Sequence, residues 1–346
     1  MNFAKRLIVW YLENKRDLPW RATKDPYKVW LSEIILQQTR VEQGKPYYFK
    51  FLQAFPNVFS LANASEEEVL KLWQGLGYYS RARNLLYTAQ HVAFNLGGEF
   101  PNNHKNLVKL KGVGDYTASA IASICFDEAQ AAVDGNVYRV LARLFGIETP
   151  TNSSAGIKQF RNLAQELISK DDPANFNQAL IEFGSEQCKP RNPLCNTCPF
   201  SSECVAYNQN KIAQLPVKLK KLKVRKRHFN YLVFVSENGE TIMEQRRGKG
   251  IWEGLYEFPL VETPAEASVE NLVMEAGVQD YFSNSPKEFY LYNEIPIVHK
   301  LTHQHLYTKF WICSCETLPA QGVRFEEVNK YPVPVLIENF IDTFDL

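Results

Sequence analysis

The sequence predicts a multidomain protein in which an all-α N-terminal part is followed by an α+β C-terminal part. Its 346 residues exceed the usual size of one domain, and 45% of them are hydrophobic, which is enough for more than one core. Up to about residue 206 the apolar residues recur at helical spacing. After the basic stretch VKLKKLKVRKR (217–227), short runs alternate between apolar and polar residues. This change of pattern marks a boundary between two folds.

Four segments of the N-terminal part have helical apolar spacing and are separated by glycine- or proline-containing stretches. We expect helices over residues 29–43, 66–74, 80–96 and 137–147. In the C-terminal part, residues 230–246 contain two alternating runs joined by Asn238-Gly239, a dipeptide that is favoured in tight hairpin turns. Residues 305–315 are predicted to form a strand and residues 268–277 a helix.

Charge is distributed unevenly along the chain. Residues 1–227 carry 31 Lys and Arg against 20 Asp and Glu, and the remainder carries 8 against 18, although the whole chain has a net charge of +1. A basic N-terminal part can neutralise the phosphates of a nucleic acid. Because seven of the positive charges belong to residues 217–227, a lysine-rich linker is the alternative explanation for part of this excess.

The sequence has no apolar run that approaches the roughly 20 residues of a membrane span. Residues 1–20 mix charged with apolar positions and lack a small-residue cleavage site, so we interpret them as a mature helix. We therefore expect a cytoplasmic protein without a membrane partner, associated with the nucleoid if its source is bacterial. In such a reducing compartment, clustered cysteines are more often metal ligands than disulfides.

Four of the seven cysteines lie in the stretch CKPRNPLCNTCPFSSEC (188–204). Tetrahedral zinc sites usually pair their ligands as two C-x-x-C units, but this stretch has only one such pair. Four thiolates in one loop also suit a [4Fe–4S] cluster. The spacing of Cys188, Cys195, Cys198 and Cys204 favours the cluster and leaves zinc open.

The stretch LKGVGDYTASAIAS (110–123) combines a glycine-rich turn with a predicted helix. Gly112, Val113 and Gly114 would leave backbone N–H groups free to bind a DNA phosphate without reading its sequence. The following Asp115 suits the N-cap of the helix. An ordinary glycine turn between two helices is the alternative.

Glu33 is a candidate proton donor. In the predicted helix 29–43 it shares one face with Gln37 and Arg40, and bulky apolar residues flank it. If Glu33 faces a pocket, this apolar surrounding raises its pKa and allows it to serve as an acid. Without a pocket, it is an ordinary solvated residue of a helix.

Asp134 is a candidate partner for Glu33. It precedes Asn136, which we expect to be the N-cap of the next helix. Cleavage of a glycosidic bond uses one carboxyl group that protonates the leaving group and another that stays charged. The alternative is that Asp134 only forms the turn at Asp134-Gly135.

Together these stretches resemble those of the helix-hairpin-helix DNA glycosylases that carry an iron–sulfur cluster, and within that superfamily the MutY family of adenine DNA glycosylases. The resemblance covers about residues 7–204 and, more weakly, the chain from residue 227 onwards. The stretches that carry it are LPWR (18–21), DPYKVWLSEIILQQTRV (25–41), GLGYYSRARNL (75–85), GVGDYTA (112–118), VDGNVYRVLAR (133–143) and the cysteine loop. It implies a [4Fe–4S] cluster rather than zinc.

The resemblance implies a monofunctional DNA N-glycosylase of base excision repair that removes adenine mispaired with 8-oxoguanine or guanine. The adenine is flipped out of the duplex, protonated at N7 by Glu33 and hydrolysed from its sugar, whose positive charge Asp134 stabilises. Asn136 and Tyr116 orient groups around the reaction. The implied adenine pocket is formed by Arg16, Leu18, Trp20 and Glu182. The implied contacts to DNA and 8-oxoguanine in this part are Gln37, Gln38, Thr39, Leu76, Tyr78, Gly112, Val113 and Gly114.

Tyr116 also distinguishes this chain from endonuclease III-like relatives, which have a lysine at the corresponding position and cut the DNA backbone through a Schiff base. A phenol cannot form that imine. We therefore expect no strong lyase activity.

The C-terminal part resembles the Nudix-hydrolase fold. A working Nudix enzyme needs several glutamates to hold magnesium, and the corresponding stretch ENLVMEAG (270–277) keeps only Glu275 among the closing glutamates. We therefore expect binding without hydrolysis. The resemblance implies recognition of 8-oxoguanine by the loop Leu301, Thr302 and His303. His299, His303 and His305 could also suggest a metal site, but ordinary hydrogen bonding along a strand is the favoured interpretation of these histidines.

The predicted domains are a six-helix module with the hairpin (25–134), a cluster module (1–24 with 135–206), a basic connector (207–227) and a Nudix-like 8-oxoguanine recognition domain (228–346). We expect a monomer that binds double-stranded DNA containing adenine opposite 8-oxoguanine, with repair or replication proteins as candidate partners of the connector. Three alternatives stay open: a catalytically silent lesion-binding protein, a relative directed at another base, and an electron-transfer protein.

Overall fold

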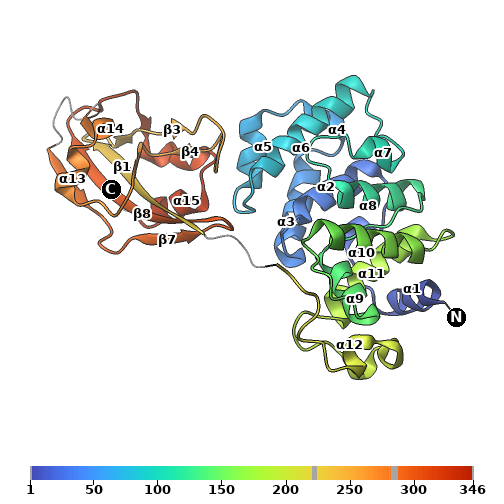
Figure 1. The fold of residues 1–346 in the computed structure, drawn as a ribbon. Coiled ribbons are helices and arrows are strands. Elements are labelled where there is room, and N and C mark those ends of the chain that lie inside the picture. Colours follow the sequence, from blue (N-terminus) through green and yellow to red (C-terminus); the bar gives the residue numbers. More distant parts are fainter. Residues whose placement is uncertain (1, 220–223, 280, 282–286, 345–346) are drawn as a thin grey trace. The chain divides into compact units, whose positions relative to one another are not determined.

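The computed structural model describes residues 2–219, 224–279, 281 and 287–344 (Figure 1). The chain divides into two compact units. The first unit comprises Met1–Asn63 and Asn84–Lys220, and the second comprises Ala64–Arg83 and Lys221–Leu346. An all-α part followed by an α+β part is therefore confirmed, but the segment Ala64–Arg83 belongs with the C-terminal part. The finer division of the helical part stays a prediction, and residues 220–223 of the basic connector lie outside the described residues.

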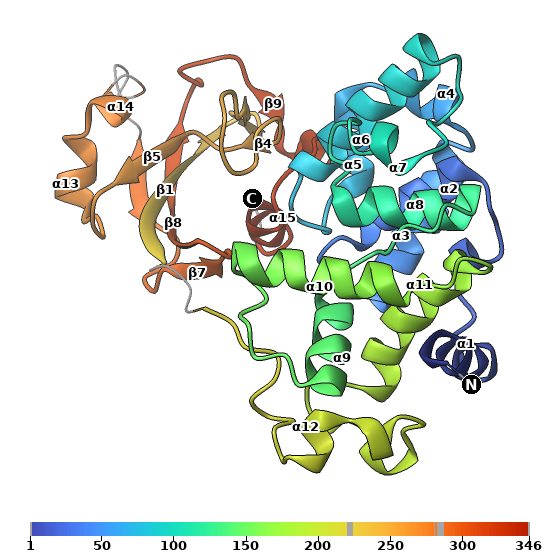
Figure 2. The ribbon, with the colours of Figure 1, turned by 45° about the vertical axis from the view of Figure 1, so that its right-hand side comes forward.

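The first unit is helical throughout its described length (Figure 2). Its longer helices are α1 (Phe3–Asn14), α2 (Pro26–Leu36), α3 (Val41–Ala54), α8 (Asp115–Phe126), α9 (Gly135–Phe145), α10 (Ser154–Leu167) and α11 (Pro173–Glu182), and α6 (Ser80–Gln90) spans the boundary between the units. Its shorter turns of helix are η1 (Pro19–Arg21), α4 (Val58–Ala62), η2 (His91–Asn95), α7 (His104–Leu107), η3 (Phe183–Gln187), η4 (Cys195–Thr197), η5 (Ser201–Glu203) and α12 (Val205–Asn208).

Two side-chain caps fix the starts of the helices that surround the site. Asp25 accepts a hydrogen bond from the backbone N–H of Tyr27 at 2.9 Å, and Pro26 occupies the first position of α2. α9 begins after Asp134 and ends at Gly146, whose φ of 67° suits glycine. A Cβ at Gly146 would also lie 2.5 Å from Val205, so both ends of α9 are defined locally.

The single helix predicted over 29–43 is wrong. α2 ends at Leu36, Gln38 adopts a left-handed φ of 56°, and Arg40 begins α3. The chain turns here because α3 packs closely on the end of α2: a Cβ on Gly44 would lie 2.8 Å from Cδ2 of Leu36. Apolar spacing runs through the turn because both helices contribute to one core, so spacing alone could not show the break.

The core beside the cysteine loop is formed by α1, α9, α10 and α11. Leu7, Leu141, Phe160 and Phe176 are fully buried in it, and the side chain of Cys198 packs against it. The high fraction of large apolar side chains at helical spacing explains why this part folds without a sheet.

The second unit is built around a five-stranded sheet in the order β5-β1-β8-β6, with β7 also paired to β8. Its strands are β1 (Arg225–Ser236), β2 (Glu240–Thr241), β3 (Glu244–Gln245), β4 (Tyr256–Glu257), β5 (Leu260–Thr263), β6 (Glu288–Leu291), β7 (Ile297–Lys300), β8 (Gln304–Cys315) and β9 (Val323–Arg324). Its helical elements are α5 (Glu66–Trp73), α13 (Val269–Val273), α14 (Ala276–Gln279), η6 (Phe325–Lys330) and α15 (Val335–Ile341). β1 and β8 are parallel, and the other pairings of this sheet are antiparallel.

Helices cover both faces of this sheet (Figure 2). On one face Leu232 and Trp311 pack with Leu272 of α13. On the other, the ring of Phe310 stacks on that of Phe340 of α15 with centroids 4.1 Å apart. The alternation of the strands thus places successive residues on two buried faces. The strand predicted at 305–315 is confirmed.

Two local predictions for this unit need correction. The turn at Asn238-Gly239 is present, but the second run does not continue as the partner strand of β1: Glu240 and Thr241 form β2, which pairs with β9. The helix predicted over 268–277 is two short helices, α13 and α14. Among the described helices, none is long and apolar enough to cross a membrane.

Candidate active site

A cavity of about 890 Å³ opens in the first unit at the starts of α8 and α9 and beside α2. α2 and α8 are buried around most of their circumference, and α8 consists largely of small residues, so the two helices pack closely. Of the residues singled out from the sequence, the cavity is lined by Arg16, Leu18, Trp20, Glu33, Gln37, Gln38, Thr39, Arg40, Gly114, Asp115, Tyr116, Asp134 and Asn136. These residues come from distant parts of the sequence, and folding brings them to one site.

Glu33 of α2 is partly accessible through the cavity but is otherwise enclosed by protein. Burial raises the pKa of its carboxyl group from 4.5 to about 7. The hydroxyl group of Tyr116 lowers this pKa as a hydrogen-bond donor, and the nearby charge of Asp134 raises it. Glu33 is therefore about half protonated at neutral pH, which suits a general acid.

Asp134 is held as the N-cap of α9. Its Oδ1 accepts hydrogen bonds from the backbone N–H groups of Asn136 at 2.8 Å and Val137 at 2.9 Å, and its Oδ2 accepts one from Nδ2 of Asn136 at 2.7 Å. Burial raises the pKa of Asp134, and these hydrogen bonds oppose that effect. Because all three partners donate to the carboxyl oxygens, the geometry favours the ionised form. Asp134 itself is thus the N-cap, and Asn136 lies in the first turn, not at the predicted cap position.

Glu182 does not line the cavity but anchors two arginines that do. It is completely buried, and its two carboxyl oxygens accept hydrogen bonds from Arg16 at 2.9 and 2.7 Å and from Arg21 at 2.7 Å. Burial alone would raise the pKa of Glu182, but the hydrogen bonds from the two guanidinium groups lower it to about 2. The wall of the cavity that contains Arg16 is therefore fixed by a buried ion pair.

The glycine-rich turn joins α7 to α8 as predicted. Gly112 has a φ of 80°, and a Cβ on it would lie 2.8 Å from Cβ of Asn84, whereas a Cβ on Gly114 would meet no atom within 4 Å. Gly114, not Asp115, is the N-cap of α8. Asp115 forms an ion pair with Arg161 at 2.9 Å, which offsets its charge beside the helix terminus, and its other oxygen lies 3.3 Å from Nε2 of His104.

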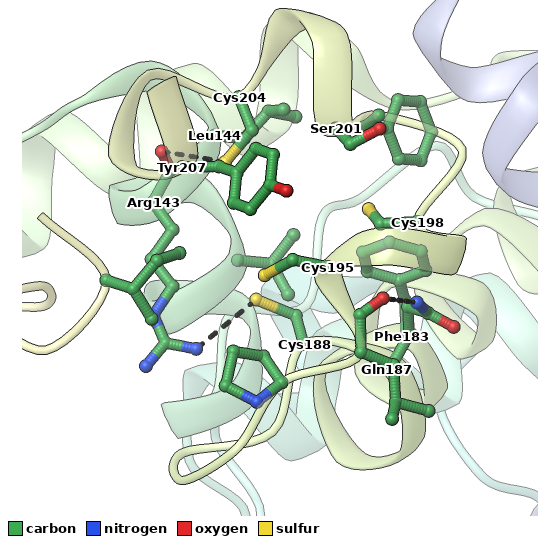
Figure 3. Close-up of a pocket in the computed structure, with 15 residues that line it drawn as sticks. Arg143, Leu144, Phe183, Gln187, Cys188, Cys195, Cys198, Ser201, Cys204 and Tyr207 are labelled. Atoms are coloured by element: carbon green, nitrogen blue, oxygen red, sulfur yellow. Dashed lines mark hydrogen bonds between the residues drawn. The ribbon is translucent and has the colours of Figure 1, made fainter. Parts of the chain in front are cut away.

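The four clustered cysteines line a second, largely apolar cavity between the cysteine loop and α9 (Figure 3). All are free thiols. Burial raises the pKa of Cys198 to about 11, and the other thiols of the group add to this shift. Among the described residues, no three His, Cys, Asp or Glu side chains are arranged to hold one metal ion. A cluster has four irons, each with its own cysteine, so four sulfurs around an apolar cavity fit a cluster better than a single ion.

Comparisons with known proteins find a matching family for each of the two parts of the chain. A profile of the HhH-GPD superfamily of base excision DNA repair proteins matches residues 31–170, and a NUDIX domain profile matches residues 230–343. The chain is 34% identical over 319 residues to an adenine DNA glycosylase of Buchnera aphidicola subsp. Baizongia pistaciae, covering 90% of this chain and 86% of that protein. The chain belongs to the adenine DNA glycosylase family.

With two other relatives, the matched region is a smaller share of this chain and of the relative. The adenine DNA glycosylase of Arabidopsis thaliana is 39% identical over 302 residues, which are 75% of this chain and 48% of that protein. The one of Mus musculus is 45% identical over 222 residues, 62% of this chain and 43% of that protein. This chain thus spans about half the length of these two relatives.

Solved structures match the helical part. A thermostable thymine-DNA glycosylase has a TM-score of 0.56 and 32% identity, covering 60% of this chain and 95% of that one. A non-covalent endonuclease III–DNA complex has a TM-score of 0.52 at 21% identity, covering 60% and 94%, and so indicates the fold alone. Membership of the adenine DNA glycosylase family accounts for the order of the motifs in the sequence.

In this member of the adenine DNA glycosylase family, five further predicted contact residues belong to the second unit: Leu76, Tyr78, Leu301, Thr302 and His303. Tyr78 is 49% exposed, with a left-handed φ of 49°, and its hydroxyl group lies 2.6 Å from Oγ1 of Thr302. Leu76 is buried. Thr302 and His303 are exposed in the turn between β7 and β8, where the N–H of Leu301 donates to the carbonyl of Gln304 at 2.8 Å. His299 packs its ring edge-on against Trp252.

Three arginines at the site were not assigned from the sequence. Arg21 lines the cavity and binds Glu182, and it belongs to the stretch LPWR (18–21) that contributed to the resemblance. Arg139 and Arg143 are buried in α9, and both contact the cysteine loop. Their signal in the sequence is weak but present: two arginines four residues apart interrupt the apolar face of VYRVLARL.

Proposed function

We propose that the protein is an adenine DNA glycosylase that excises adenine opposite 8-oxoguanine or guanine from duplex DNA. The observation that carries this proposal is the pair of unlike carboxyl groups in one cavity: Glu33, with a pKa of about 7, and Asp134, held by three donors. Such a pair suits an acid and a charged stabiliser. The cavity is also large enough for a flipped base, which needs a pocket outside the duplex.

The proposed reaction uses the two carboxyl groups in turn. Glu33 gives its proton to N7 of the extruded adenine, and the bond between the base and C1′ then breaks with its electron pair leaving on the base. The ionised Asp134 stabilises the cationic sugar, and water supplies the hydroxyl group that completes hydrolysis. Tyr116 and Asn136 orient the acid and the stabiliser, since each hydrogen-bonds to one of them.

Around this centre we propose that Arg16, Leu18 and Trp20 contact the adenine, with Glu182 holding Arg16 in place. The turn Gly112–Gly114 would bind a phosphate, which is supported by the open space beside Gly114 and the neutralisation of Asp115. In the second unit, Tyr78, Thr302 and His303 would meet the 8-oxoguanine, and the exposure of these side chains supports this assignment. Leu301 belongs to the same loop and completes the set of residues predicted to contact 8-oxoguanine there.

We propose further that Cys188, Cys195, Cys198 and Cys204 hold a [4Fe–4S] cluster. The candidate donor set consists of four sulfurs, and the cavity that they surround is lined mostly by apolar side chains such as Val140, Leu144 and Phe200, with Arg143 and Gln187 among its polar residues. The cluster would join the loop to α9 and so stabilise this part of the fold. The chemistry at the adenine needs no cluster, because Glu33 and Asp134 supply the acid and the charged stabiliser.

The test is strand breakage at the target base. The protein is incubated with a duplex containing adenine opposite 8-oxoguanine and then treated with alkali, which cuts the backbone wherever a base has been removed. We expect a break at the adenine, and a loss of at least about 100-fold in rate for Glu33→Gln, the size typical of a general acid. Glu166→Gln, an exposed glutamate of α10, is the matched control and should keep its rate.

Duplexes with another base in place of the adenine separate the alternatives. Thymine opposite guanine is the informative one, because a thymine-DNA glycosylase is among the structural neighbours. Removal of thymine in preference to adenine would replace the proposed specificity. Tight binding of the 8-oxoguanine duplex without any breakage would indicate a silent lesion-binding protein instead.

A further inference from the structure

Arg143 of α9 lies at the side of the cavity that the four cysteines line, with its guanidinium group directed toward Cys188 (Figure 3). It is 2% exposed. Its Nη1 donates hydrogen bonds to Sγ of Cys188 at 3.5 Å and to the carbonyl oxygen of Lys189 at 2.7 Å, and its Nη2 donates to the carbonyl of Pro190 at 3.1 Å. Nε donates to the carbonyl of Leu215 at 3.1 Å. One guanidinium group thus joins α9, the cysteine loop and the segment that follows it.

These partners are unusual for a buried arginine. They are carbonyl oxygens and a sulfur, and no carboxylate of the described residues lies within ion-pair distance of Arg143. A buried cation without an opposite charge is costly. Four cysteine thiolates around an iron–sulfur core make an anionic group, and such a group beside Arg143 would supply the missing negative charge.

Cys188 and Cys204 differ in how they meet Arg143. Sγ of Cys204 lies 3.4 Å from the backbone carbonyl oxygen of Arg143, a contact that needs the thiol proton and is lost when the sulfur binds iron. The contact with Cys188 instead has the guanidinium as donor. It therefore survives deprotonation and becomes stronger, because a thiolate is the better acceptor.

We propose that Arg143 is a positioning residue for the iron–sulfur cluster: it fixes the loop at Cys188 through two carbonyl oxygens and donates a charge-assisted hydrogen bond to the sulfur of this ligand. This inference rests on the proposed cofactor. It implies that Arg143 slows loss of the cluster and raises its reduction potential, because a positive donor at a sulfur stabilises the more negative, reduced state.

Two variants and one matched control test this role. Arg143→Met removes every contact of the side chain, and Arg143→Lys keeps the positive charge but cannot reach four acceptors at once. Arg6→Met is the control, because Arg6 binds the same loop at Pro199 and Glu203 and lies over the ring of Phe200 without a contact to sulfur. Each protein is purified without oxygen, and its iron content, visible iron–thiolate absorption and reduction potential are measured.

The expected result is that the absorption of Arg143→Met decays in the presence of an iron chelator on the order of tenfold faster than that of the wild type, the factor expected for one hydrogen bond to a charged group. Its reduction potential should be more negative, Arg143→Lys should lie between, and Arg6→Met should match the wild type in potential.

The outcomes separate this inference from the cofactor proposal. Wild-type protein without iron and sulfide would overturn the cofactor itself. Wild-type protein that holds iron, with Arg143→Met equal to Arg6→Met in decay rate and potential, would overturn the role of Arg143 alone. If Arg143→Met does not fold, as judged by far-UV circular dichroism, Arg143→Lys decides, and equality with Arg6→Met again rejects the role.

Discussion

The guanidinium group of Arg139 donates a hydrogen bond from Nη2 to Oδ1 of Asn136 at 2.8 Å. Its Nε donates to the carbonyl oxygen of Cys188 at 2.8 Å, and Asn136 in turn donates to Oδ2 of Asp134 at 2.7 Å. A continuous chain of hydrogen bonds therefore runs from a predicted cluster ligand to the predicted stabiliser of the sugar. Arg139 touches neither the cavity nor a sulfur, so it acts through Asn136.

Arg139→Met should slow excision of adenine by about 10- to 100-fold. Residues that hydrogen-bond to the groups holding a reacting side chain typically have effects of this size. The rate is measured in single turnover with saturating enzyme, and DNA affinity is measured separately and should change little. Asn136→Ala should slow the reaction similarly. If the two substitutions act through one chain, the double variant loses little more than either single variant. Fully additive losses would show that they act independently.

The rate of excision should depend on the protonation of Glu33. With a pKa of about 7 in the folded protein, the acid form is lost as the pH rises through 7, and the single-turnover rate should fall by about tenfold per pH unit above that value. Activity that stays constant between pH 7 and 9 would contradict Glu33 as the proton donor.

The same pKa affects stability. Between pH 4.5 and 7 the folded protein keeps a proton on Glu33 that the unfolded chain has released, so the contribution of this group to stability declines as the pH rises through this window. Glu33→Gln should therefore be more stable than the wild type at pH 8, by at most about 3 kcal/mol, and equal to it near pH 4. Urea unfolding at both pH values measures this difference. It also shows that the inactive variant is folded.

The buried carboxylate of Glu182 should stabilise the fold. Its pKa of about 2 lies below the ordinary 4.5, so its contribution is complete above pH 4.5 and is lost as the pH falls towards 2. Glu182→Gln leaves two arginines short of their partner and should cost about 3–5 kcal/mol in free energy of unfolding at pH 7. Glu186→Gln, which removes partly exposed ion pairs to Arg16 at 3.2 Å and to Lys189 at 3.8 Å, is the control and should cost at most about 1 kcal/mol. Equal losses would mean that burial of the pair does not matter.

Tyr116 should prevent formation of a Schiff base. Its phenol faces Glu33 in the cavity, whereas Lys111 is exposed, with its Nζ over the ring of Tyr87 at 4.3 Å, and does not line the cavity. The wild type and Tyr116→Phe should not be trapped on DNA by borohydride. Tyr116→Lys places a primary amine in the cavity and should yield a trapped complex. Efficient trapping of the wild type would contradict the monofunctional assignment.

The contact between Tyr78 and Thr302 should contribute to discrimination between 8-oxoguanine and guanine. Each hydroxyl group can donate one hydrogen bond, so the 2.6 Å contact uses the proton of one and leaves the proton of the other for a bound base. Tyr78→Phe and Thr302→Val are compared singly and together for binding to duplexes with 8-oxoguanine or guanine opposite adenine. We expect a coupling of about 0.5–3 kcal/mol for the 8-oxoguanine duplex alone. The same coupling energy for both duplexes would show that the contact supports the fold and does not discriminate between the two bases.

The sequence singled out Glu33, Asp134 and the four cysteines from local patterns, each with an ordinary alternative, and the resemblance to a known family then assigned their roles, which stay predictions. Asp134 precedes a helix that it caps, and Glu33 sits among apolar residues that raise its pKa. The break between α2 and α3 was not predictable in this way, since it depends on Gly44 meeting Leu36 across the turn. The proposed roles of Arg139 and Arg143 depend on carbonyl oxygens that lie 49 and 46 residues away in the chain.

The grouping of Ala64–Arg83 with the C-terminal part makes that part discontinuous in the sequence. Nζ of Lys71 donates to the carbonyl of Tyr331 at 3.1 Å, and Nε2 of Gln74 donates to Glu338 at 2.7 Å. A proteolytic cut after Leu219 would spare every residue that lines the cavity beside α2, α8 and α9, yet would deprive α5 and the turn after it of these partners. The fragment would retain this cavity but expose a helix without its packing partners, so we expect α5 to unfold more readily than the rest of the fragment.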